Sequence, residues 1–418
     1  MSRRFGLISS CFLGLALAGN AWAQTPDEAV GRANLAIEQG RYGDALRELE
    51  AAEPDAEGRA QYLLAGLYLQ GLGVPQNFDA ALTHYRRAAS LGNLAAKNAL
   101  GRAYAEGRAV ERDPRLALEY LTAAALSGDP GYQSDLARAL EAGLDGEPRL
   151  EEAASWYQRA AEQGDASAIT SLGVLYLQGH GVERDAGRAI ELFSRASEAG
   201  NARARNNLGL IYVRGEDVER DYDRAFELFS LAAEQGQREA MTNLSVMYAS
   251  GFGVAVDEAE SLRLLERARH AGGLSLSALL QQVGFPYDAR LVEPDLSQPL
   301  DPAEEQAARA GDPVALYRTA LRFLNGAGIR QDVPGGIERM ERAAEAGLGS
   351  AQFTLGLMYA NGRSLPQDYE NAYIWTNRAA LAAVPAASEI RDALAAEMSA
   401  AQLQRAQERV ATLVDAAD

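Results

Sequence analysis

Apolar residues along this chain recur every three or four positions, the spacing that places them on one face of an α-helix. The pattern is clearest before Gly107, where Ala96, Leu100 and Tyr104 lie four residues apart. The aromatic position of this stripe recurs in other segments, with Leu140 as the exception: Tyr68, Tyr104, Tyr176, Tyr212, Tyr248, Phe323 and Tyr359. The stripe predicts a series of amphipathic helices that each contribute an aromatic side chain to a shared core.

Two series of glycines place these helices in a repeat. Each series advances in steps of 36 residues, and each is interrupted once. A fixed period of this length is typical of a solenoid, in which each unit buries its apolar face against its neighbours. The first series ends alanine-rich segments, at Gly92, Gly128, Gly164, Gly200, Gly236, Gly272, Gly311 and Gly347. The second series is Gly71, Gly107, Gly143, Gly179, Gly215, Gly251, Gly326 and Gly362.

Each unit is interpreted as two helices joined by a turn. A glycine of the second series ends the first helix as a left-handed cap. Six residues later an Asp or Asn is expected to accept hydrogen bonds from the free amides of the second helix, and only Arg149 breaks this rule. A glycine inside a helix costs about 1 kcal/mol relative to alanine. Such a glycine nevertheless recurs, which predicts that a neighbouring helix lies too close for a side chain. The glycines are Gly101, Gly173, Gly209 and Gly356.

The combined pattern Leu-Gly-x-x-Tyr-x-x-Gly-x-Gly-Val, then Asp, then Ala-Ala-x-x-Gly, resembles the Sel1-like repeat family, a relative of the tetratricopeptide repeats. The resemblance covers about residues 60–383. It implies an all-α fold, a right-handed α-solenoid of antiparallel helix pairs with a C-terminal helical cap. Ser399 and Gln402 have the spacing of a capping box and predict the start of the last helix.

The chain divides into six predicted segments. Several prolines crowd residues 273–311, which disfavours helix, so this segment is interpreted as a decayed repeat, with a hinge or docking loop as the alternative. The segments are a signal peptide (1–23), a tetratricopeptide-like unit (24–58), an array of six Sel1-like units (59–272), a degenerate repeat or linker (273–311), two further units (312–384) and C-terminal capping helices (385–418).

The N-terminus has the features of an export signal. Arg3 and Arg4 precede an apolar stretch, and Ala21 and Ala23 form a small-x-small cleavage site. This predicts a periplasmic or secreted protein, with lipid attachment at Cys11 or twin-arginine export as alternatives. No later apolar run approaches the length of a membrane span. Cys11 is the only cysteine, so the exported chain is expected to be held together by packing alone.

Charge and residue content argue against several functions. The net charge is −18, and binding to nucleic acid depends on neutralising phosphates with Lys and Arg. Lys97 is the only lysine and no phosphate-binding loop contains it. The three histidines, His84, His180 and His270, occupy different phases of the repeat, so no spacing brings them together. We therefore expect no catalytic, cofactor or metal site and no enzymatic activity.

The remaining candidate is the concave surface of the solenoid, which the first helix of each unit usually lines. By resemblance to tetratricopeptide proteins, the polar positions beside the core stripe contact a bound peptide; the alternative is that they are solvated positions without a role. A peptide-binding concave surface predicts a non-catalytic periplasmic scaffold or regulator that binds a protein or peptide partner. The alternatives are an envelope hydrolase acting on cell-wall material and a self-assembling structural protein. The positions are Asn98, Arg102, Glu106, Ser134, Arg138, Thr170, Gln178, Asn206, Arg214, Thr242 and Ser250.

Overall fold

The computed structural model describes residues 26–52, 57–107, 110–271, 275–283, 299–362 and 364–415, and the predicted signal peptide lies outside them. The described residues form 22 α-helices and no strand. In chain order the helices are α1 (Pro26–Glu38), α2 (Tyr42–Ala51), α3 (Arg59–Gln70), α4 (Phe78–Ser90), α5 (Leu94–Glu106), α6 (Pro114–Ala125), α7 (Pro130–Glu141), α8 (Leu150–Glu162), α9 (Ala166–Gln178), α10 (Ala186–Glu198), α11 (Ala202–Arg214), α12 (Tyr222–Glu234), α13 (Arg238–Ser250), α14 (Glu258–His270), α15 (Leu276–Gln282), α16 (Pro302–Arg309), α17 (Pro313–Asn325), α18 (Val333–Glu345), α19 (Gly349–Asn361), α20 (Tyr369–Leu381), α21 (Ala387–Glu397) and α22 (Ala400–Asp415).

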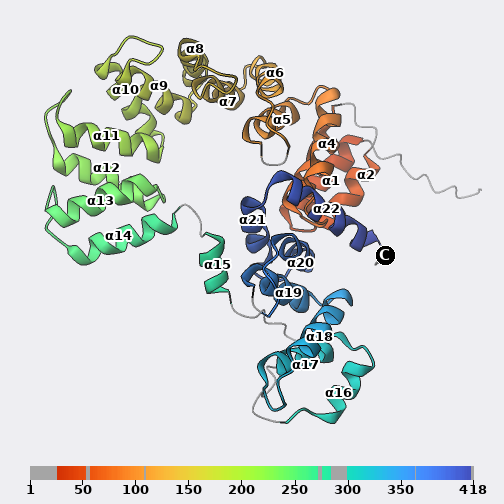
Figure 1. Cartoon of the computed structure of the whole chain (residues 1–418). Coiled ribbons are helices and arrows are strands. Elements are labelled where there is room, and N and C mark those ends of the chain that lie inside the picture. Colours follow the sequence, from red (N-terminus) through yellow and green to blue (C-terminus); the bar gives the residue numbers. More distant parts are fainter. Residues whose placement is uncertain are drawn as a thin grey trace, which may run out of the picture.

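From α1 to α14 and again from α16 to α20, consecutive helices pack in pairs and each pair packs against the next, so the predicted all-α solenoid is confirmed. The pairs from α3 to α14 follow an arc (Figure 1). On this arc α5, α7 and α9 lie on the inner side, and α6, α8 and α10 lie on the outer side. The first helix of these units therefore lines the inner surface, as the repeat predicts.

The predicted caps form at both ends of the helices. Asp221 accepts a hydrogen bond from the backbone nitrogen of Arg224 at 2.8 Å, and equivalent Asp or Asn side chains cap the other second helices. Arg149 makes no such bond, which confirms the expected exception. Gly179 ends α9 with a φ of 72°, in the left-handed region that glycine adopts without strain.

The glycines inside the helices mark close contacts within each unit. A Cβ atom on Gly209 would lie 2.7 Å from the ring of Phe229, and one on Gly173 would lie 2.8 Å from the ring of Phe193. Both rings belong to the second helix of the same unit and are fully buried. The prediction that a neighbouring helix excludes a side chain at these positions is confirmed.

The core stripe is buried unevenly. Ala96 and Leu100 are fully buried and Tyr104 is 7% exposed. Most other aromatic residues of the stripe, such as Tyr212, are only partly buried and pack at the edges of the hydrophobic clusters. The alanine and leucine positions thus form the core, and the aromatic ring usually covers it.

The regular array ends at α14. In most units two consecutive small residues near the end of the second helix lie against the next pair, as Ala232 and Ala233 do. In α14 the second of these positions is Arg269, whose side chain is 70% exposed. The short helix α15 packs against α21 instead, and its Leu276 lies in the hydrophobic cluster of the C-terminal helices. A second array begins with α16, which packs on α17.

The C-terminal helices return to the beginning of the chain. The helix α22 packs against α4 (Figure 1), and Arg391 of α21 donates to the Gln70 carbonyl oxygen at the end of α3. Phe78, at the start of α4, joins the hydrophobic cluster formed by α20, α21 and α22. The sequence predicts only that these helices cover an end of the solenoid. They also cover the α3–α4 turn and so join the end of the second array to the start of the first. We call the circuit of helices closed by this junction the ring.

Candidate functional site

A buried polar network forms the closure between the α3–α4 turn and the C-terminal helices. The backbone nitrogen of Gln76 donates to Asn377 Oδ1 at 3.0 Å, and Asn377 Nδ2 donates to the Gln76 carbonyl oxygen at 3.1 Å. The Tyr373 hydroxyl donates to Gln76 Oε1 at 2.9 Å. Gln407 Nε2 donates to that hydroxyl, also at 2.9 Å, and Gln407 Oε1 accepts from the backbone nitrogen of Phe78. Burial raises the pKa of Tyr373, which keeps this phenol a neutral donor.

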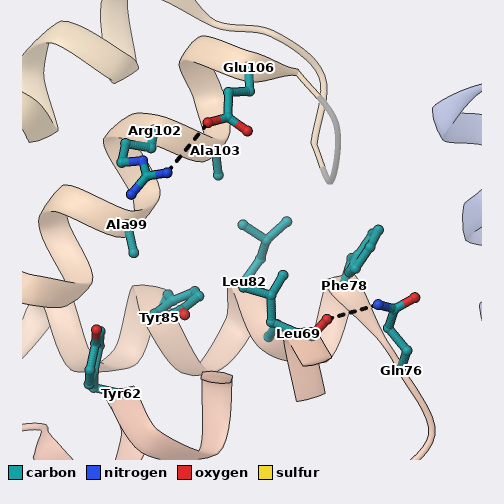
Figure 2. Close-up of a pocket in the computed structure, with 11 residues that line it drawn as sticks. Tyr62, Leu69, Gln76, Phe78, Leu82, Tyr85, Ala99, Arg102, Ala103 and Glu106 are labelled. Carbon is teal, nitrogen blue, oxygen red and sulfur yellow. Dashed lines mark hydrogen bonds and ion pairs between the residues drawn. The ribbon is translucent and has the colours of Figure 1, made fainter. Parts of the chain in front are cut away.

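An apolar cavity of about 430 Å³ lies beside this closure, between α3, α4 and α5. Figure 2 shows Ala99 and Ala103 of α5 facing the side chains of α4. Arg102 and Glu106 stand at its edge and form an ion pair at 3.9 Å. The rest of the lining is mostly aromatic and aliphatic and comes from Tyr62, Leu69, Gln76, Phe78, Ala81, Leu82 and Tyr85. We call this the apolar cavity.

A second cavity, of about 400 Å³, crosses the inner surface from α5 to α11, and we call it the polar cavity. Asn98 Nδ2 donates to Asp135 Oδ2 at 2.7 Å, and Arg138 forms an ion pair with the same carboxylate. Asn98 Oδ1 and Ser134 Oγ are buried and have no hydrogen-bond partner among the described residues. Arg203 of α11 lies at the far side of this cavity. The cavity thus collects three of the residues predicted from sequence, Asn98, Ser134 and Arg138.

A third, smaller cavity of about 170 Å³ contains two more of the predicted residues, Gln178 and Arg214. An ion pair between Arg184 and Asp217, 3.1 Å long, lies in the same lining. Both groups of that pair are already engaged and the cavity is small, so it offers fewer free groups than the polar cavity.

Four predicted residues lie outside these cavities. Thr170 is fully buried and its hydroxyl donates to the Ala166 carbonyl at 2.7 Å, so it does not line the groove, contrary to expectation. Asn206 is 5% exposed and accepts from Asn243 at 2.8 Å. Thr242 is exposed but donates to the carbonyl of Arg238, and Ser250 is exposed. Polar residues in equivalent repeat positions therefore differ in access, because their neighbours differ.

The glycine and stripe patterns do not predict the apolar cavity, although the sequence carries one signal of it. The position four residues before the glycine that ends the first helix is a buried Leu, Ile or Met in five units, namely Leu67, Leu175, Ile211, Met247 and Met358. Ala103 occupies the same position in its unit and leaves that volume open. Comparison of the repeats by position, instead of by glycine alone, shows this substitution.

His84, one of the three histidines, is packed against neighbouring side chains. His84 stacks on Tyr68, with ring centroids 5.3 Å apart, and its Nδ1 lies 2.8 Å from Gln61 Oε1. It is a packed helix residue, as its repeat position suggests. In the part of the chain that the structure describes, no three His, Cys, Asp or Glu side chains converge in a way that would hold a metal ion. Among the same residues, no helix is long and apolar enough to span a bilayer.

Comparison with known proteins agrees with this architecture. A family model described as the Sel1 repeat matches residues 58–93, 94–129, 131–165, 166–201, 202–237, 238–273, 313–348 and 349–383. A solved Sel1 repeat protein from Oxalobacter formigenes is 29% identical, with a TM-score of 0.54, over 57% of this chain and 96% of that one. A protective antigen of uropathogenic Escherichia coli is 26% identical, with a TM-score of 0.49, over 93% of this chain and 84% of that one. A search of curated proteins finds no match.

Proposed function

Because this chain belongs to the Sel1 repeat family, we propose that it is a non-catalytic scaffold or regulator that binds a peptide segment of a partner protein on its inner surface. Sel1 and tetratricopeptide-like folds commonly mediate contacts between proteins. The proposal assigns the polar cavity as the place where the partner's backbone is held. It also assigns the protein to the periplasm or the extracellular space.

One observation carries the assignment to the polar cavity. Asn98 Oδ1 and Ser134 Oγ are buried there without a partner among the described residues, and a buried polar atom left unpaired costs about 1–3 kcal/mol. A peptide backbone supplies both kinds of partner in alternation, an N–H that donates and a C=O that accepts. Asn98 Oδ1 accepts a hydrogen bond from the peptide N–H, and Ser134 Oγ donates one to the peptide C=O. Asp135 holds Asn98 in place at 2.7 Å, so the acceptor is positioned before a peptide arrives.

Binding is tested with the exported chain, residues 24–418, as bait for an envelope extract, followed by calorimetry with each captured protein in purified form. The Asn98→Ala/Ser134→Ala variant should bind the partner about tenfold more weakly or worse, since each lost hydrogen bond is worth about 1 kcal/mol. A Thr242→Ala/Ser250→Ala variant is the control, because both residues are exposed and lie outside the three cavities described above. Equal affinity of all three proteins would move the binding site away from the polar cavity. Failure of every captured protein to bind in purified form would contradict the scaffold itself.

The proposed location rests on the predicted signal and has its own test. Residues 1–30 fused to alkaline phosphatase should give an enzyme that is active in intact cells, because that reporter needs an oxidising compartment to form its disulfides. N-terminal sequencing of the full chain should begin at Gln24. An inactive fusion, or a mature chain that still carries Arg3 and Arg4, would place the protein in the cytoplasm.

A further inference from the structure

The apolar cavity exists because one unit carries small residues where others carry large ones. Ala99 and Ala103 on α5 leave room above Leu82 and Tyr85 of α4 (Figure 2). At the position of Ala103, five other units carry a buried Leu, Ile or Met. In the next unit Ala139 is 9% exposed and packs inside a hydrophobic cluster. At Ala103, by contrast, the missing volume opens to the inner surface as part of the cavity.

The lining is suited to a large apolar side chain. Tyr62 and Tyr85 face each other with ring centroids 5.7 Å apart, and Leu69, Leu82 and Phe78 complete the apolar wall. Tyr85 is 8% exposed and Leu82 is 3% exposed, so the wall is part of the packed core. Aromatic walls of this kind bind another ring through edge and offset contacts as well as through burial.

The edge of the cavity is suited to a peptide. Arg102 and Glu106 have side chains that are 57% and 50% exposed, and their contact at 3.9 Å is loose. An exposed pair of this kind is weak, so both groups are available to an incoming backbone: the guanidinium donates to a carbonyl oxygen and the carboxylate accepts from an amide. An acyl chain would use neither group.

The apolar and polar cavities are adjacent along one helix. Asn98 lines the polar cavity and Arg102 lines the apolar one, and both lie on α5. The two residues are separated by one helical turn, about 6 Å along the axis. Two residues of an extended peptide advance about 6.6 Å. A peptide that crosses the polar cavity and turns along α5 at Asn98 therefore places a side chain over the apolar cavity about two residues further along.

From these relations we propose that the apolar cavity receives one aromatic or large aliphatic side chain of a partner peptide whose backbone lies in the polar cavity. This inference rests on the proposed function and adds the partner's chemistry, a large apolar anchor two residues from the segment bound at Asn98. The closure of the ring completes the anchor site. Gln76 and Phe78 line the cavity, and Asn377, Tyr373 and Gln407 fix their positions from the other end of the chain.

The probe is a phage-displayed library of random heptapeptides, selected on the exported chain. Enriched peptides should share a Trp, Phe, Tyr, Leu or Met at one position. The Ala103→Leu variant should bind them about tenfold more weakly or worse, because the new side chain occupies the space of the anchor, and truncating or excluding an anchor typically has an effect of this size. Ala103→Leu introduces a residue that equivalent positions already carry, so its melting temperature should not fall. Ala99→Leu fills the same cavity from another position. This variant is used instead if Ala103→Leu fails to fold.

The control is Ala139→Leu, the same exchange at the same repeat position outside the lining. Ala139 is already packed in a cluster, so the larger side chain should lower the melting temperature, whereas peptide affinity measured below that temperature should stay unchanged. Asn377→Ala should weaken peptide binding without touching the cavity, because Gln76 loses its support. Peptides that lose affinity with Asn98→Ala/Ser134→Ala but bind Ala103→Leu normally would overturn the anchor site and leave the scaffold standing. Absence of any enriched peptide would contradict both, and displacement of an apolar dye by lauric acid but by no peptide would reassign the cavity to a lipid.

Discussion

Gln76 and Asn377 lie 301 residues apart in the chain and are joined by two hydrogen bonds, in which the asparagine side chain pairs with both backbone groups of the glutamine. Asn377 is fully buried and Gln76 is 5% exposed. The pair ties the first complete unit of one array to the last unit of the other. It therefore defines the ring, and the apolar cavity beside it depends on the same contact.

The first prediction concerns this pair. Asn377→Ala leaves a buried N–H and a buried C=O of Gln76 without partners, each at a cost of about 1–3 kcal/mol. We expect the α3–α4 turn to separate from the C-terminal helices in part of the population. Small-angle X-ray scattering should then show a larger radius of gyration than that of the wild type. A donor–acceptor fluorophore pair placed on α1 and α22 should show lower transfer.

Asn325→Ala is the matched control for this experiment. Asn325 is exposed at the end of α17 and bonds to the Leu321 carbonyl of its own helix, so its loss should leave both measurements unchanged. If Asn377→Ala keeps the wild-type radius of gyration and transfer efficiency, the ring is held by other contacts, such as the bond from Arg391 to the Gln70 carbonyl oxygen at 3.0 Å.

A second prediction compares the effect on stability of replacing two glycines that lie inside helices. Gly209→Ala places a methyl group 2.7 Å from the buried ring of Phe229, and overpacking of this kind costs about 1–3 kcal/mol. Gly66 lies within α3, and a Cβ atom there would meet nothing within 4 Å, so Gly66→Ala should stabilise by about 0.5–1 kcal/mol through helix propensity. Urea unfolding of both variants measures the difference. If the two substitutions change the free energy of unfolding in the same direction, the close approach between Gly209 and Phe229 has no effect on stability.

A third prediction concerns alkaline pH. Burial raises the pKa of Tyr85 from its ordinary value of 10.0 to about 12. The unfolded chain therefore loses this proton first, so stability that is full below about pH 10 is lost as the pH rises towards 12. Tyr85→Phe removes this dependence. Between about pH 9 and pH 11 its unfolding free energy should improve relative to wild type by about 1 kcal/mol.

Tyr212→Phe is the control for the alkaline experiment, because Tyr212 is only partly buried at the edge of its cluster. Its unfolding free energy should follow that of the wild type across the same pH range. A Tyr85→Phe variant that also follows the wild type would mean that the phenol of Tyr85 reaches water in the folded protein.

A fourth prediction tests the caps. Asp221→Ala removes the bond at 2.8 Å to the backbone nitrogen of Arg224 and should cost about 1 kcal/mol in thermal unfolding. Arg149→Ala changes the same repeat position where no side-chain cap forms, so its cost should be within about 0.5 kcal/mol. Equal costs would indicate that the cap contributes nothing beyond surface charge.

The candidate site was predictable only in part. Asn98, Ser134 and Arg138 do meet in one cavity, because residues on the same face of successive first helices are brought together by the stacking of the units. Thr170 follows the same spacing and is fully buried, since its threonine hydroxyl bonds to its own helix and neighbouring side chains cover it. The period of the repeat predicts which way a side chain points. Whether solvent or a partner can reach that side chain depends on the volume of the neighbouring side chains.

The sequence by itself determined the helices, their caps, the close approach at glycines such as Gly209 and the interruption of the array after α14. Each of these depends on residues close together in the chain or on a contact repeated in every unit, so a local pattern records it. Only the tertiary structure decided that α22 meets α4 and that Asn377 pairs with Gln76. Such a contact occurs once, between segments 301 residues apart, and its position depends on the summed rotation of all the units between them, which no single unit specifies.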